Sequence, residues 1–150
     1  MPRFARLFEA AADTLSAYYQ AVADSDVEAL MALWIDEDFA SFIDSGGAHW
    51  HSVESIRAGL AQLASEGALP ESVEPLDVRV YDSLGTVVYA VAEAHRRRDA
   101  VAPPRMVYTT YVMVHERGEW RIAHIHASEM PEETANEFAA KMRFGQGALH

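Results

Sequence analysis

Apolar and polar residues alternate with two different periods along this chain, and the change of period divides it into a helical half and a strand half. In the first half, apolar residues recur at steps of three and four, which predicts amphipathic helices. One helix is marked by Ser25 and Glu28, whose spacing fits the S-x-x-E capping box. The helices are predicted at about residues 8–22, 25–34 and 52–67.

The second half carries β-branched and aromatic residues interrupted by turn-forming glycines, which predicts strands joined by tight turns. Gly85 and Gly118 mark two of these turns, and Glu132 with Glu133 marks the start of a short C-terminal helix. Strands are predicted at about residues 36–44, 76–81, 86–95, 106–115 and 120–128. Helices followed by antiparallel strands indicate an α+β fold, in which a curved sheet packs against three N-terminal helices.

Composition limits the classes of function. The chain has 150 residues, half of them hydrophobic, so we expect one domain over residues 1–150, with a core at about 8–128 and a helical extension at 129–150. The net charge of −11 disfavours nucleic acid and anionic membranes as partners. The absence of cysteine and of a long apolar segment indicates a cytoplasmic protein.

Four segments, in order, resemble the SnoaL-like branch of the nuclear transport factor two-like superfamily. They are ADSDVEALMALW, DEDFASFIDSGG, HSVESIRAGL and RGEWRIAHIHAS. The last segment is also similar to the association domain of calcium/calmodulin-dependent kinases. The resemblance implies a cone in which helices cover the concave face of a bent sheet, a mostly apolar pocket, and dimers formed through the sheets. Because this superfamily contains isomerases, dehydratases, hydrolases, cyclases and proteins that only bind, the fold alone does not choose a function.

Comparison with ketosteroid isomerase gives the first candidate residues. The resemblance puts Tyr18 at the position of that enzyme's tyrosine, but Phe42 at its base and Thr110 at its second acid. Asp44 lies two residues beyond Phe42, and period-two alternation keeps it on the same face. We therefore name Asp44 as a candidate general base and Tyr18 as its partner. The alternative is that Asp44 only caps the Asp-Ser-Gly-Gly turn by accepting hydrogen bonds from backbone amides.

Large side chains are the candidates for a ligand-binding wall, because aromatic residues combine apolar area with a polar group. For Trp34 a plain core position is the favoured interpretation, because the amphipathic stripe of its helix explains it fully. Glu93 and His95 share a strand face with Tyr89, and we expect them near the solvated end of the sheet, with a place in the pocket lining as the alternative. The candidate ligand-binding residues are Trp34, Phe42, Trp50, Tyr89, Tyr111 and Ile125.

The last predicted strand carries two histidines. Strict alternation puts Trp120, Ile122, His124, His126 and Ser128 on one face and Ala123, Ile125 and Ala127 on the other. The resemblance implies that the second set faces the pocket, which leaves His124 and His126 to a dimer interface or the core. A metal site is disfavoured because no third ligand at a fixed spacing is evident.

Two functions stay open at this point. One is a cofactor-independent acid-base enzyme acting on a small organic molecule, as an isomerase, dehydratase, cyclase or hydrolase. The other is a non-catalytic binding or dimerisation module. In the kinase association domain two pocket arginines occupy the positions of Tyr111 and Ala127, so their replacement implies a neutral, apolar ligand. We expect a homodimer with neither a cofactor nor a metal.

Overall fold

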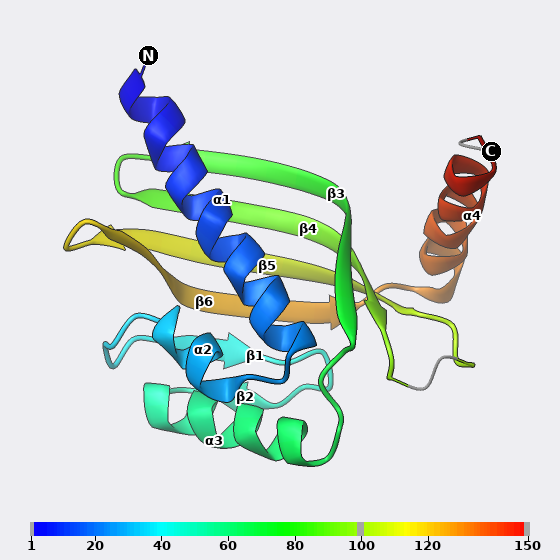
Figure 1. The fold of residues 1–150 in the computed structure, drawn as a ribbon, viewed down its shortest axis with the longest axis horizontal. Coiled ribbons are helices and arrows are strands. Elements are labelled where there is room, and N and C mark those ends of the chain that lie inside the picture. Colours follow the sequence, from blue (N-terminus) through cyan, green and yellow to red (C-terminus); the bar gives the residue numbers. More distant parts are fainter. Residues whose placement is uncertain (1, 99–100, 149–150) are drawn as a thin grey trace.

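The computed structural model describes the backbone of residues 2–98 and 101–148, and the side chains of residues 11–98 and 101–143. Phe8, in the first predicted helix, lies outside the described side chains. The elements are α1 (Pro2–Ala23), α2 (Val27–Ala32), β1 (Ser41–Ile43), β2 (His49–Trp50), α3 (Val53–Ser65), β3 (Ser72–Ser83), β4 (Thr86–Arg96), β5 (Arg105–Glu116), β6 (Glu119–Glu129) and α4 (Glu132–Ala148). Figure 1 shows this order from blue to red.

The strands form one curved, open sheet in the order β2-β1-β6-β5-β4-β3. The α+β class and the largely antiparallel sheet expected from the sequence are confirmed. One pairing departs from that expectation, because β1 runs parallel to β6, with Phe42 opposite Ile125. Parallel strands need a long connection, and here the chain between β1 and β6 passes through β2, α3, β3, β4 and β5.

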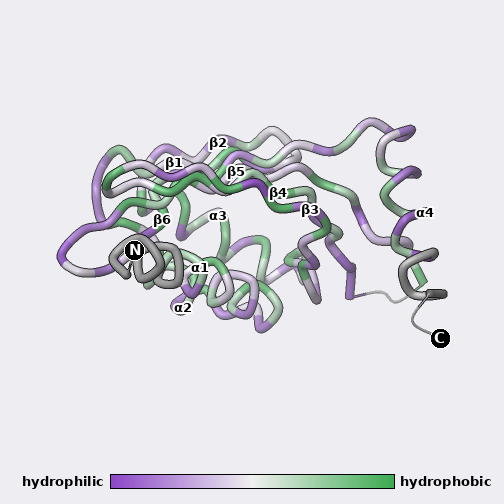
Figure 2. The backbone as a smooth tube through the Cα atoms, turned by 90° about the horizontal axis from the view of Figure 1, so that it is seen from above, coloured by the Kyte–Doolittle hydropathy of each residue, from purple (hydrophilic) through white to green (hydrophobic). Residues whose placement is uncertain are grey.

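Helices α1, α2 and α3 lie on one side of the sheet (Figure 2). The main core lies between them and the sheet, and its fully buried side chains include Leu30, Ile56, Leu60, Met113 and Ile122. Within the described residues, no helix is both long and apolar enough to cross a membrane.

The ends of the predicted helices are partly corrected. Ser52 does cap α3, accepting a hydrogen bond from the Ser55 amide at 3.1 Å. At α2, however, the cap is Asp26, whose carboxylate accepts from the Ala29 amide at 3.0 Å. Ser25 instead adopts a positive φ of 51° in the turn after α1. Helix α2 is therefore short, and Trp34 lies beyond it in an isolated bridge to Ile122.

A β-bulge in β6 corrects the expected alternation. Val112 is paired with His124 but Met113 with Ile122, so Ala123 is an extra residue without an opposite partner. An extra residue exchanges the two faces of a strand. Trp120 and Ile122 consequently face the helices and are buried, as is Ile125 further along the strand. The prediction that all five of Trp120, Ile122, His124, His126 and Ser128 share one face is wrong.

Helix α4 follows β6 and lies beyond the end of the sheet (Figure 1). A second apolar cluster joins them, in which Phe138 and Met142 of α4 contact buried Ala92, Ala94 and Met106. The helix continues to Ala148.

Candidate functional site

A cavity of about 460 Å³ opens between α1, α3 and the concave face of the sheet. Its buried part is mostly apolar. Its polar groups come from β4 and the segment after it, from β5, from the turn after β1 and from Tyr18 of α1. The residues that line the cavity include Tyr18, Val22, Phe42, Asp44, Leu60, Leu63, Leu69, Glu93, His95, Arg96, Arg97, Arg98, Arg105, Thr109, Tyr111, Ile125 and Ala127.

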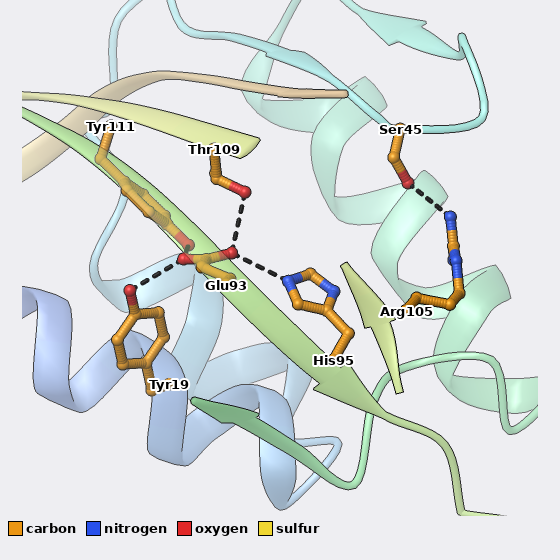
Figure 3. A network of polar contacts seen from close by, with 7 residues as sticks. All are labelled: Tyr19, Ser45, Glu93, His95, Arg105, Thr109 and Tyr111. Carbon is orange, nitrogen blue, oxygen red and sulfur yellow. Dashed lines mark hydrogen bonds and ion pairs between the residues drawn. The ribbon is translucent and has the colours of Figure 1, made fainter. Parts of the chain in front are cut away.

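The carboxylate of Glu93 is the centre of a polar network on this wall (Figure 3), and its side chain is 0% exposed. Its Oε2 accepts hydrogen bonds from the hydroxyls of Tyr19 at 2.8 Å and Tyr111 at 2.5 Å. Its Oε1 accepts from the Thr109 hydroxyl at 2.8 Å and lies 2.8 Å from Nε2 of His95. Two carboxylate oxygens offer about four acceptor sites, so this group is fully satisfied by its neighbours.

The position of Glu93 follows from the alternation of β4. Val87, Tyr89 and Val91 are buried on the face toward the helices, and Glu93 is the next residue of the same parity. Because β4 continues to Arg96, Glu93 lies well inside the sheet. The expectation that Glu93 lies near solvent is wrong. The signal was available in the sequence, since a carboxylate on the apolar face of a strand needs buried partners.

Three tyrosines surround this carboxylate in edge-to-face contacts. The ring of Tyr18 lies 5.6 Å from that of Tyr111, and the ring of Tyr19 lies 6.2 Å from it. Burial, and then the negative charge of Glu93, raises the pKa of all three phenols above the usual value. These phenols therefore stay protonated, and those of Tyr19 and Tyr111 donate hydrogen bonds to Glu93. The nearby charge of Asp44 contributes to the raised pKa of Tyr18.

His95 lies between this network and the cavity. Its side chain is 20% exposed, and Nε2 points at Glu93 while the other ring nitrogen lies on the far side of the ring (Figure 3). A carboxylate has no proton to donate when it is ionised, so the neutral imidazole donates from Nε2. Nδ1 is then the unprotonated nitrogen. This arrangement of a buried carboxylate fixing the tautomer of a histidine is suited to proton transfer.

Asp44 combines the two roles considered for it. Its Oδ2 accepts a hydrogen bond from the Gly46 amide at 3.3 Å, and its carbonyl accepts from the Gly47 amide at 2.8 Å. The same residue lines the cavity together with Phe42, two positions earlier. The turn at Gly47 needs a φ of 92°, which glycine adopts without strain. Asp44 therefore caps a turn at the cavity wall.

The other candidate residues separate into two groups. Tyr18, Phe42, Tyr111 and Ile125 line the cavity, whereas Trp34 and Tyr89 lie in the core beside it. Trp50 packs against α3, because a Cβ built on Gly59 would lie 2.2 Å from its indole ring. Phe42 connects the two groups, with its ring 5.8 Å from Trp34 and 5.2 Å from Trp50. The binding roles of these side chains stay predictions.

Four arginines line the solvent side of the cavity. Arg96, Arg97 and Arg98 come from the end of β4 and the segment after it, and Arg105 begins β5. Arg98 donates to the Ala23 carbonyl and to the Ser25 hydroxyl, both at 2.8 Å, and so links this segment to the end of α1. In the sequence Arg96, Arg97 and Arg98 are consecutive, whereas Arg105 stands apart from them.

Four further histidines, His49 and His51 at β2 and His124 and His126 on β6, do not line the cavity. His124 Nδ1 lies 2.6 Å from the Ser41 hydroxyl, and the rings of His49 and His51 are 3.7 Å apart. Burial, together with the charges of His126 and His49, lowers the pKa of His124. Among the described residues, no group of three histidine, cysteine, aspartate or glutamate side chains is arranged to hold a metal ion.

Comparison with known families identifies the domain. The profile of the SnoaL-like domain matches residues 11–133, which is most of the chain. The chain belongs to the SnoaL-like domain family. No protein with a curated description matches its sequence.

Solved structures share the SnoaL-like fold at low identity. A protein from Thiobacillus denitrificans, provisionally assigned as a calcium/calmodulin-dependent protein kinase type II association domain, superposes with a TM-score of 0.71 and 22% identity over 79% of this chain and 93% of its own. A provisional dehydratase from Streptomyces avermitilis gives 0.68 and 19% over 83% and 97%. A provisional ketosteroid isomerase from Shewanella frigidimarina gives 0.66 and 13% over 79% and 94%. At these identities the likeness establishes the fold alone.

Proposed function

We propose that this SnoaL-like protein binds a small organic molecule in the cavity and transfers a proton on it without a cofactor. An isomerase, a dehydratase or a cyclase performs chemistry of this type. The observation that carries the proposal is the contact between His95 Nε2 and the fully buried carboxylate of Glu93, made at the wall of a cavity. A fully buried carboxylate that contacts a histidine at the wall of a concave site is a typical catalytic arrangement.

In this mechanism His95 is the catalytic residue and Glu93 is a positioning residue. Glu93 has no acceptor site left for a substrate proton, because Tyr19, Thr109, Tyr111 and His95 occupy both oxygens. It holds Nε2 as the protonated nitrogen and stabilises the imidazolium that forms. Nδ1 takes a proton from a carbon or hydroxyl of the substrate and returns it to another substrate atom, so no net oxidation or reduction occurs.

Tyr18 and Asp44 supply the other polar groups of the cavity. The pKa of Tyr18 is raised by burial, so its phenol stays protonated and can donate a hydrogen bond to a substrate oxygen where negative charge develops. Asp44 remains a candidate acid or base on the turn after β1, in addition to its role as a turn cap. A second acid-base group is useful because isomerisation and dehydration need proton transfer at two atoms.

The test is deuterium exchange in heavy water, with a panel of small ketones, keto acids and β-hydroxy acids followed by proton NMR. We expect exchange above the buffer rate for at least one compound, and a decrease of about 10²–10⁴-fold in His95→Gln, the range typical of general acid-base catalysis. His115→Gln is the matched control, because His115 is exposed in the β5–β6 hairpin.

The outcomes separate the two candidate functions. An unchanged rate in His95→Gln would remove this histidine from the mechanism. If compounds bind in the cavity but none exchanges a proton faster than in buffer, the domain is a non-catalytic binding module. In that case the network around Glu93 only stabilises the fold.

A further inference from the structure

The charge on the cavity wall is opposite to that of the whole chain. The chain carries a net charge of −11 with 12 lysine and arginine residues. Four of these 12 line this one cavity, where only Asp44 and Glu93 carry negative charge, so the described wall has a formal charge of 4 − 2 = +2. Basic side chains are concentrated here although they are scarce elsewhere. Such a concentration in a concave site attracts anions.

Arg105 has the geometry of an anion anchor. Its side chain is 35% exposed, and its Nη2 donates to the Ser45 hydroxyl at 3.0 Å and to Glu129 Oε1 at 2.5 Å. These two bonds fix the guanidinium at the cavity and involve one nitrogen, whereas a guanidinium has donors on three. Because a planar guanidinium matches the two oxygens of a carboxylate, Arg105 can bind such a group in a bidentate manner.

The cavity also separates apolar from charged groups by depth. Its apolar wall is formed by buried Val22, Phe42, Leu60, Leu69 and Ile125. Arg96 and Arg97 are exposed, and Arg105 is half-buried, so the positive charge lies at the opening. A molecule that fits this gradient has an apolar body and an anionic end. His95 directly precedes the arginine run and lies next to that end.

We propose that the occupant of the cavity is a small organic carboxylate, whose carboxylate group binds Arg105 with support from Arg96 and Arg97. This inference rests on the proposed function, namely that the cavity binds a small molecule. The expectation of a neutral ligand rested only on Tyr111 and Ala127, which stand where the kinase association domain has its two pocket arginines. A carboxylate ligand replaces that expectation. The arginines come instead from the β4–β5 connection. A carboxylate bound there holds its neighbouring carbon atoms beside His95, where a proton can be removed.

The test compares acids with their uncharged amides. Hexanoate with hexanamide, and hydrocinnamate with hydrocinnamide, are titrated into the full chain by isothermal calorimetry. We expect each acid to bind at least about tenfold more tightly than its amide, because hydrogen bonds to a charged group are worth more than neutral ones. In Arg105→Gln the ratio should decrease to about one. Arg57→Gln is the control with the same charge change, on the exposed surface of α3.

The outcomes distinguish failure of the carboxylate inference from failure of the proposed function. Equal affinity of acid and amide for the wild-type chain would overturn the carboxylate inference and leave the cavity as a site for neutral molecules. An unchanged ratio in Arg105→Gln, with Arg97→Gln also unchanged, would overturn it as well. If neither acids nor amides bind, both this inference and the proposed function are wrong. Thermal melting of each variant shows whether a lost ratio comes from unfolding.

Discussion

Glu93 and His95 lie two residues apart on β4, and His95 Nε2 is 2.8 Å from Glu93 Oε1. This contact determines the tautomer of the histidine. Replacing Glu93 with Gln keeps the shape of the side chain but exchanges a charged acceptor for an amide with only one oxygen. We expect Glu93→Gln to lower the free energy of unfolding by about 3 kcal/mol, because buried hydrogen bonds to a charge are lost.

The same variant should change the histidine itself. Nitrogen NMR is expected to show His95 protonated at Nε2 in the wild-type chain and a mixture of tautomers in Glu93→Gln. Glu74→Gln, an exposed position on β3, should leave both the urea unfolding curve and the His95 signal unchanged. A single unchanged tautomer in Glu93→Gln would show that the carboxylate does not position the ring.

The two roles of Asp44 can be separated by two substitutions. Asparagine also accepts hydrogen bonds in turns, so Asp44→Asn should retain stability to within about 0.5 kcal/mol while it removes the charge. Asp44→Ala removes the acceptor for the Gly46 amide and should cost about 1 kcal/mol in urea unfolding. If Asp44→Asn also retains full proton exchange with a substrate, Asp44 acts only as a turn cap.

The raised pKa values of Tyr18, Tyr19 and Tyr111 predict a dependence of stability on alkaline pH. A phenol whose pKa is raised on folding holds its proton more tightly in the folded state. Its contribution is therefore complete below the unfolded value of 10.0 and is lost as the pH rises above it. Urea unfolding across this range should show a falling free energy of unfolding.

Tyr18→Phe tests the origin of this loss, because it removes one of the three phenols and keeps the aromatic ring. We expect a shallower decrease with pH above 10.0 than in the wild-type chain. Identical curves for the two proteins would show that ionisation of Tyr18 is not coupled to folding.

The outer face of the sheet is the expected site of a homodimer. Tyr81, Val88, Val112 and His124 lie in one row across β3, β4, β5 and β6, and Tyr81 is 72% exposed. A row of mostly apolar side chains on an exposed sheet face favours association with another surface. In a two-fold dimer, the same face of a second copy packs against it. We expect sedimentation at micromolar concentration to show a dimer for the wild-type chain and a monomer for Val88→Glu.

Leu84→Glu is the matched control for the dimer. Leu84 is 94% exposed at the tip of the β3–β4 turn, so the new charge should leave the mass unchanged. A monomer in the wild-type chain at these concentrations would contradict the proposed interface.

The sequence determined the fold class because hydrophobic periodicity is a local property, which can be recognised from the order of the residues alone. The stripe of α1, the Ser52 cap of α3 and the glycine turns of the hairpins were all readable in this way. The tertiary structure decided which strand face meets the cavity. The bulge at Ala123 reverses the faces of β6, and a bulge depends on the partner strand, so alternation alone could not reveal it.

For the candidate site as well, the sequence determined one part and the tertiary structure decided the rest. At the level of sequence, the resemblance to ketosteroid isomerase led to Tyr18 and Asp44, and aromatic character led to Tyr111. All three share the cavity wall. Only the tertiary structure brought Tyr19, Thr109 and Tyr111 around Glu93 and set four arginines at the opening of the cavity. These contacts join α1, β4 and β5 across many residues of chain. Hydrogen bonds between such distant segments depend on sheet register and helix packing, which have no local signal.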